Sequence, residues 1–160
     1  MLKELEPIAD KLNEERAILN RTLDQMTDAE AAGIRVTPEW SLKDAVAHLV
    51  GAERGMTRIA RGMANGTNPQ LPQGYSNDEY NARQVAKRKE QSVAQVRAEL
   101  NATRADLLQF LESITPEQLA LCGEHPLAGN ISLKELLVII YSHESTHANE
   151  ISHQYRESKK

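Results

Sequence analysis

The sequence predicts an all-α protein, a bundle of four long helices, on three observations. Aromatic residues make up only 4% of the chain, and no stretch alternates apolar and polar residues for long, so strand signals are weak. Apolar residues instead recur at spacings of three, four and seven, as they do on one face of a helix. Signals for helix starts recur as well. Helices that are each apolar on one side bury those sides together most simply in a bundle.

The helix-start signal is a capping box, in which Ser or Thr stands three positions before Asp, Glu or Gln. The hydroxyl accepts one unpaired N–H of the first turn, and the later side chain reaches back to the backbone of the first residue. Such pairs occur at Thr27–Glu30, Ser41–Asp44, Ser76–Glu79, Thr115–Gln118 and Ser132–Glu135.

The first helix is expected over Leu2–Met26, with an apolar stripe at Leu5, Ile8, Leu12, Leu19, Leu23 and Met26. Pro7 fits only if this helix begins near it or bends there. A loop with Gly33 and Pro38 follows. The second helix begins at Ser41 and ends near Asn65 and Gly66, where glycine suits the left-handed cap.

The second half of the chain supplies the other two helices. Two Pro and two Gly in residues 66–75 predict a long crossover loop between the second and third helices. The third helix is expected from Ser76 to Ile114, and a short helical turn over Pro116–Leu121 comes next. A loop through Gly123 and Gly129 then leads to the fourth helix, from Ser132 to Tyr155.

Length and charge limit the classes of function. The 160 residues fit one domain, 1–160, and the formal net charge of −4 argues against non-specific nucleic-acid binding. The most basic stretch, Arg83–Lys89, is interpreted as a solvated helix face. Apolar residues outside the stripes, such as Ile18 and Val50, suggest a homodimer.

Other features concern compartment. The single cysteine, Cys122, allows no internal disulfide, which is typical of a reducing compartment. The amino-terminal segment is charged and lacks the apolar core of a signal peptide. No apolar run approaches the length of a membrane span. We therefore expect a soluble cytoplasmic protein with no membrane partner.

Histidines interrupt the apolar stripes and give the one concrete functional lead. His143 and His147 stand one helical turn apart on the inner face of the fourth helix, where two imidazoles can bind one divalent metal. His48 lies at the edge of the second helix's stripe and could complete the site. Glu53 falls within that stripe, and a buried carboxylate needs a partner or a metal. The alternative is that these histidines are hydrogen-bonded core residues.

The run from His143 to His147 also has the letters of the zinc-protease motif, with Glu144 after the first histidine. A protease is disfavoured because the chain offers neither a suitable third ligand downstream nor strands for the accompanying sheet. His153 points off the metal-facing side, and Glu150 remains on the same helix. Glu144 is therefore expected to support the metal site or to line a pocket. His125 is expected to be exposed or structural.

Three segments resemble the DinB-like superfamily. The run from Trp40 to Glu53 is similar to its W-[ST]-x-x-[DE]-x-x-x-H-L-x-x-x-E segment, and the run from Tyr141 to Ile151 is similar to its final H-x-x-x-H helix. Asn81-Ala-Arg83 and the apolar residues up to Leu111 resemble the DfsB/ClbS branch and the amino-terminal domains of mycothiol-dependent maleylpyruvate isomerases.

The resemblance implies a four-helix bundle with a metal site at His48, His143 and His147. Members include transferases and isomerases that use mycothiol, bacillithiol or glutathione. It therefore implies a divalent cation (Zn, Ni or Fe), a low-molecular-weight thiol and a small electrophile as substrate. Pocket residues are expected at Trp40, Glu53, Asn81 and Glu144. Two alternatives stay open, namely a non-catalytic protective protein that binds a hydrophobic or DNA-damaging toxin, and a bundle whose histidines are only structural.

Overall fold

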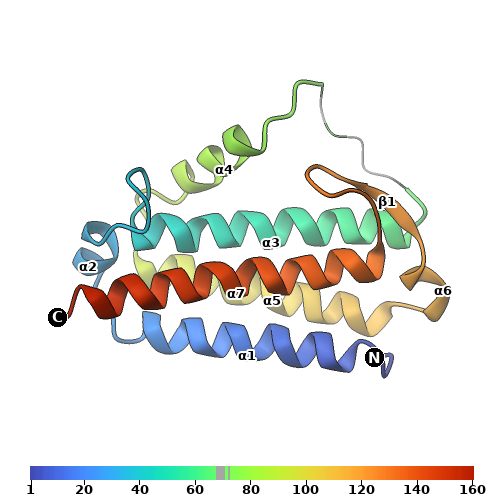
Figure 1. Cartoon of the computed structure of the whole chain (residues 1–160), viewed down its shortest axis with the longest axis horizontal. Coiled ribbons are helices and arrows are strands. Elements are labelled where there is room, and N and C mark those ends of the chain that lie inside the picture. Colours follow the sequence, from blue (N-terminus) through green and yellow to red (C-terminus); the bar gives the residue numbers. More distant parts are fainter. Residues whose placement is uncertain (68–70, 72) are drawn as a thin grey trace.

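The structure is a computed structural model that describes residues 1–67, 71 and 73–160, and these residues are mostly helical (Figure 1). The four long helices are α1 (Glu6–Leu23), α3 (Leu42–Ala64), α5 (Val93–Ser113) and α7 (Leu133–Glu157). The short helices are α2 (Asp28–Gly33), α4 (Asn77–Ala86) and α6 (Pro116–Leu119). The predicted four-helix bundle is confirmed.

The four long helices form a square in which α1 packs against α5 and α7, and α3 packs against the same two helices. Figure 1 shows that α1 and α7 run in one direction while α3 and α5 run in the other. Because α3 and α5 are neighbours with the same direction, the chain must return along the bundle between them. It does so through the connection after α3 and through α4, which lies against α3. Residues 68–70 and 72 of the predicted crossover loop lie outside the described residues.

The capping boxes set the starts of the helices that carry the histidines. At the start of α3, Asp44 N donates to Ser41 Oγ at 3.2 Å, and Ser41 N donates to Asp44 Oδ2 at 2.9 Å. Ser132 and Glu135 make the same pair of bonds at the start of α7. The end of α3 also follows the prediction, because Gly66 has a φ of 67°.

Helix α1 begins at Glu6, with Pro7 in its first turn, rather than at Leu2, because proline suits a position whose N–H has no partner within the helix. It ends at Leu23. The residues after it, predicted as a loop, include α2, which starts with the Thr27–Glu30 capping box.

The prediction of one helix from Ser76 to Ile114 was wrong. The chain forms α4 and α5 with turns between them, since Ser92 and Gln95 make a capping box that starts a new helix. Arg88, in the stretch interpreted as a solvated face, is buried and pairs with Glu99 of α5 at 2.9 Å. This ion pair ties the end of α4 to the bundle.

The region predicted as a loop through Gly123 and Gly129 is an antiparallel hairpin, with β1 (Cys122–His125) and β2 (Gly129–Ser132). Gly129 has a φ of 71°, a conformation that permits the turn at the start of β2. Two short strands without aromatic or β-branched runs carry little strand signal, so the sequence pattern missed them.

The interior consists of two apolar clusters at the two ends of the bundle. Between them lies a charged layer formed by Arg16, Glu53, Arg104 and Glu144, one from each long helix, all buried. Val50 is also buried, so it gives no support to the predicted homodimer. Across the described part of the chain, no helix is both long and apolar enough to cross a membrane.

Candidate metal centre

Three imidazoles converge between α3 and α7. His48, His143 and His147 each offer a ring nitrogen, and these atoms lie within 4.8 Å of one another. His48 Nε2 and His143 Nε2 are 3.1 Å apart. The ring centroids of His143 and His147 are 4.6 Å apart, as expected for positions one helical turn apart. The structure thus brings together the three histidines that the sequence singled out.

The site keeps His48 and His143 neutral. Burial, and then the neighbouring imidazoles His143 and His147, lower the pKa of His48 from 6.5 to about 3, although the Asn81 side chain opposes part of this shift. Burial and His147 lower the pKa of His143 to about 4. A neutral imidazole is the form that binds a metal.

The arrangement fits a divalent cation. Two nitrogens bound tetrahedrally to one Zn²⁺ lie about 3.3 Å apart, close to the 3.1 Å between the Nε2 atoms of His48 and His143. His147 Nδ1 lies 2.8 Å from Glu150 Oε2, a contact that places the ring proton on Nδ1 and leaves Nε2 as an acceptor. His48 Nδ1 is buried and has no hydrogen-bond partner in the described residues.

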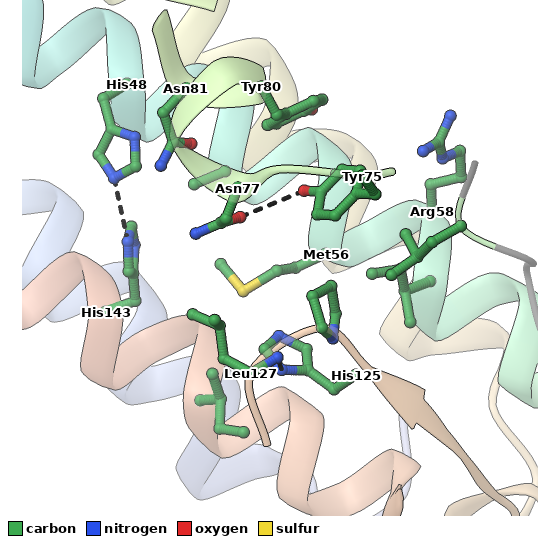
Figure 2. Close-up of a pocket in the computed structure, with 16 residues that line it drawn as sticks. His48, Met56, Arg58, Tyr75, Asn77, Tyr80, Asn81, His125, Leu127 and His143 are labelled. Atoms are coloured by element: carbon green, nitrogen blue, oxygen red, sulfur yellow. Dashed lines mark hydrogen bonds between the residues drawn. The ribbon is translucent and has the colours of Figure 1, made fainter. Parts of the chain in front are cut away.

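His48 and His143 form one end of a pocket that encloses about 720 Å³, counting its open mouth. Helix α3 provides one wall with residues 48, 52, 55, 56 and 59, which share a helical face. Helix α4 and the tip of the hairpin cover this wall (Figures 1 and 2). Asn81, predicted as a pocket residue, does line the pocket and lies beside His48.

His125 also lines this pocket, contrary to the expectation that it is exposed or merely structural. The hairpin carries it from a distant part of the sequence to the wall opposite α4 (Figure 2). No periodic pattern surrounds His125, so the sequence had no signal for this placement. His153 is exposed, as expected, and Cys122 is exposed too.

Two glycines allow α4 to lie close to α3. A Cβ on Gly51 would lie 2.6 Å from the Cβ of Gln84 and closer still to its Cγ. A Cβ on Gly55 would lie 3.0 Å from the hydroxyl of Tyr80, which donates a hydrogen bond to Gly51 O at 3.0 Å. Any larger residue at position 51 would push α4 outward, so this glycine sets the height of the pocket.

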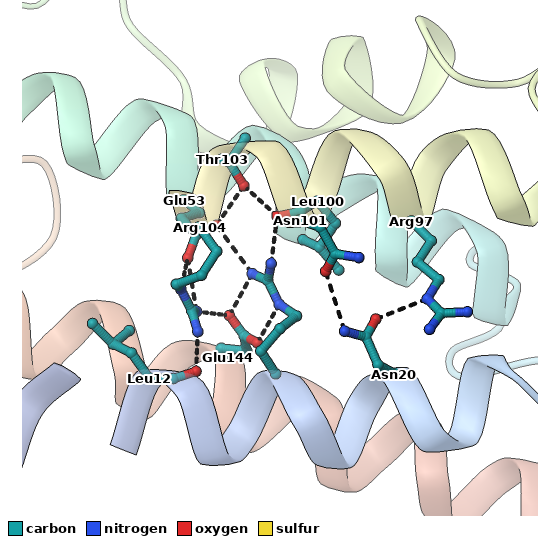
Figure 3. Close-up of polar contacts among 10 residues, drawn as sticks. Leu12, Asn20, Glu53, Arg97, Leu100, Asn101, Thr103, Arg104 and Glu144 are labelled. Carbon is teal, nitrogen blue, oxygen red and sulfur yellow. Dashed lines mark hydrogen bonds and ion pairs between the residues drawn. The ribbon is translucent and has the colours of Figure 1, made fainter. Parts of the chain in front are cut away.

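Glu53 and Glu144, predicted as pocket residues, are not among the described residues that line it. Arg16 donates from Nε to Glu144 Oε1 at 2.8 Å and from Nη2 to Glu53 Oε2 at 3.0 Å. Arg104 donates to the same two carboxylates (Figure 3). The layer therefore contains two positive and two negative charges, and Glu144 has no role like that of the glutamate in a zinc protease.

The layer is also hydrogen-bonded to its surroundings. Arg16 donates to the carbonyl of Leu100, and Arg104 donates to the carbonyl of Leu12. Thr103 donates to Glu53. Trp40, the remaining predicted pocket residue, packs its ring on His48 with centroids 4.9 Å apart, and it too is absent from the described pocket lining.

Comparisons with known proteins place this geometry in a family. The family described as the DinB superfamily matches residues 11–151. A search of curated proteins found no match.

Several solved structures share the fold. The mycothiol-dependent maleylpyruvate isomerase superposes with a TM-score of 0.79 and 14% identity over 92% of this chain, which spans only 60% of the isomerase. A second neighbour is YfiT from Bacillus subtilis, described as a probable metal-dependent hydrolase with an unusual four-helix bundle topology. It superposes with a TM-score of 0.75 and 18% identity over 99% of this chain and 90% of YfiT. The colibactin self-resistance protein ClbS, in complex with dsDNA, superposes with a TM-score of 0.74 and 14% identity over 93% of each chain. At identities of 14% to 18%, these TM-scores show a shared fold and nothing beyond it.

Proposed function

The chain belongs to the DinB superfamily, and we propose that it is a divalent-metal-dependent enzyme that detoxifies a small electrophile, using a low-molecular-weight thiol as the second substrate. One observation carries this proposal. His48 and His143, two of the three converging imidazoles, also line one end of a pocket that is open to solvent. Three neutral nitrogen ligands leave coordination positions free for substrate, which is typical of catalytic sites.

A cation held by His48, His143 and His147 would supply Lewis acidity that favours the deprotonated form of a thiol or of water. In the transfer reaction, the thiol sulfur bonds to an electrophilic carbon, the leaving group departs with the bonding electrons, and the thiol proton passes to water. Glu150 holds the ring of His147 in one orientation. Asn81 and the other pocket residues would orient the electrophile beside the histidines.

The first test is elemental analysis of the purified, untagged protein and of two variants on α7. His147→Ala removes a proposed ligand, whereas His153→Ala removes an exposed histidine of the same helix. We expect about one divalent metal per chain in the wild type and in His153→Ala, and almost none in His147→Ala. Absence of metal from the wild type, even after reloading with Zn²⁺ or Ni²⁺, would refute the metal site.

The second test measures turnover. Glutathione, bacillithiol and mycothiol are each supplied with chlorodinitrobenzene, and release of chloride and formation of the thioether are followed. We expect turnover with at least one thiol and its loss in His48→Ala, in step with metal content. Full activity in a variant devoid of metal would contradict the mechanism.

A second candidate is a non-catalytic protective protein that binds a hydrophobic or DNA-damaging molecule. It is favoured by the apolar side chains of the pocket, which include Met56, Ile59 and Ile139. This function predicts that a toxin raises the melting temperature without any product being formed. Detection of turnover would remove it.

The remaining expectations stay predictions: one domain over residues 1–160, a cytoplasmic location and a homodimer. The prediction that the chain binds no nucleic acid rests on its net charge of −4, but it is in tension with the complex of ClbS with dsDNA. Titration of labelled duplex DNA at low salt, where electrostatic binding is strongest, tests it directly.

A further inference from the structure

The polar groups that line the pocket include hydrogen-bond donors but, among the described residues, no carboxylic acid. Among the described residues that line it, none is Asp or Glu, although the chain contains 23 acidic residues against 19 Lys and Arg. A cavity without carboxylates in an acidic protein does not repel an anion. The identity of the donors shows which anion it suits.

Arg58 of α3 supplies a positive charge at the end of the pocket away from His143 (Figure 2). The arginines one turn before and nearly one turn after it are paired, Arg54 with Glu99 and Arg61 with Asp106. Within the described part of the chain, Arg58 has no ion-pair or hydrogen-bond partner. Its side chain is exposed, and no described residue competes with a ligand for its guanidinium.

His125 supplies a neutral donor. Its Nδ1 accepts hydrogen bonds from the backbone N–H groups of Leu127 at 3.3 Å and Ala128 at 3.1 Å, which places the ring proton on Nε2. Burial also lowers the pKa of His125, so the ring stays neutral near pH 7. Its Nε2–H group is thus left to donate to a ligand oxygen.

Asn77 adds a second neutral donor. The hydroxyl of Tyr75 donates to Asn77 Oδ1 at 3.2 Å, and this bond orients the amide. Figure 2 shows the amide nitrogen of Asn77 turned away from Tyr75, toward the interior of the pocket. Both protons of this amide nitrogen therefore face the space between Arg58 and the histidines.

The middle of the pocket is apolar. Met56 and Ile59 of α3 face Ile139 of α7, and Leu127 of the hairpin is 75% exposed at the mouth. The ten residue steps from position 48 to position 58 span about 15 Å of helix. An apolar body of a small molecule would cover these side chains and would shield Leu127 from water.

We propose that this pocket takes a small organic carboxylate, with its carboxylate bound by Arg58, its apolar body against Met56 and Ile59, and its reacting end at the histidines. The inference deepens the proposed function, on which it rests, by naming the substrate class. Guanidinium and carboxylate form a charge-assisted pair that a neutral isostere cannot reproduce.

Phenylhexanoate and its neutral amide, phenylhexanamide, make a matched pair of probes. Binding of each is measured by calorimetry and by the shift in melting temperature. The protein is used as purified and again after removal of metal by chelator and dialysis, because a carboxylate could also bind the metal. Arg58→Gln is compared with Arg54→Gln, which removes an exposed arginine of the same helix that is not among the described pocket residues.

We expect the acid to bind about tenfold more tightly than the amide, in metal-free protein as well. Arg58→Gln should abolish this preference, whereas Arg54→Gln should preserve it. Equal affinities for acid and amide in metal-free wild type, a preference that survives Arg58→Gln, or no binding of either probe at millimolar concentration would each overturn the proposal. A wild type that takes up no metal even on reloading with Zn²⁺ or Ni²⁺, but still prefers the acid through Arg58, would refute the proposed enzyme while supporting this ligand class.

Discussion

Replacing Arg104 by methionine tests whether the charged layer is a structural unit of the bundle. Methionine keeps much of the length and apolar volume of the arginine but removes its charge. Arg104 bonds to Glu53, to Glu144 and to the carbonyl of Leu12, and only 4% of it is exposed. The substitution leaves two buried carboxylates with one arginine, and leaves a buried carbonyl without this donor.

Breaking a buried ion pair from one side typically costs about 3–5 kcal/mol, because the remaining charge is uncompensated. For a chain of this size, each kcal/mol lowers the melting temperature by roughly 2–4 °C. We therefore expect Arg104→Met to melt about 6–20 °C below the wild type. Arg97→Met, on the same helix, breaks a more exposed pair with Asp24 and should cost no more than about 1 kcal/mol.

The assay is urea and thermal unfolding of metal-free protein, so that bound metal does not mask the loss. A double variant, Arg104→Met with Glu144→Gln, restores the charge balance of the layer. It should lose less stability than the sum of the single variants, by about 1–3 kcal/mol. If Arg104→Met cost no more than Arg97→Met, or if the two changes were additive, the charged layer would not act as a unit.

The other predictions concern the metal centre and the pocket. Glu150→Gln should weaken metal affinity by about 10–100-fold in a competition assay with a chelating dye, since Glu150 orients His147; an unchanged affinity would show that this contact does not matter. Gly51→Ala should destabilise the protein by about 1–3 kcal/mol, since the new methyl group overlaps Gln84 and displaces α4; a melting temperature at or above that of the wild type would contradict the close packing. In metal-free protein, the pKa of His48 is about 3 in the folded state, against 6.5 for an ordinary histidine in the unfolded chain. Between pH 3 and pH 6.5, the unfolded chain therefore binds more protons than the folded protein. Stability should therefore fall as the pH drops below about 6.5, by about 2 kcal/mol at pH 5 for this one group; an equal slope in His48→Asn would assign the effect to other residues.

Much of the fold could be read from local pattern. The boxes at Ser41 and Ser132 fixed the starts of the two helices that carry the histidines, and the spacing of His143 and His147 put both on one side of α7. These features depend on residues within a few positions of one another, so they can be predicted without the tertiary structure. The position of His48 at the edge of its own helix's stripe made it the candidate third ligand, and the resemblance pointed to the same residue.

The positions of the charged layer can be seen in the sequence pattern. Each long helix has a gap in its apolar stripe, and a charged residue fills each gap: Arg16 between Leu12 and Leu19, Glu53 between Leu49 and Met56, Arg104 between Leu100 and Leu107, and Glu144 between Ile140 and Ala148. Glu53 was noticed as a buried carboxylate in need of a partner. Its partners could not be identified, since a stripe gives the inward face of a helix but not the level at which another helix meets it.

The sequence by itself determined which segments are helical, which sides face inward and which histidines could share a metal, because these follow from the 3.6-residue period and from local capping. Only the tertiary structure decided that Glu53 and Glu144 belong to the charged layer, and that His125 and Arg58 line the pocket of His48. The charged layer depends on the packing of the four long helices, and the pocket depends on the path of α4 over Gly51 and on the fold of the hairpin. Contacts between segments far apart in the chain are set by packing, which no local period encodes.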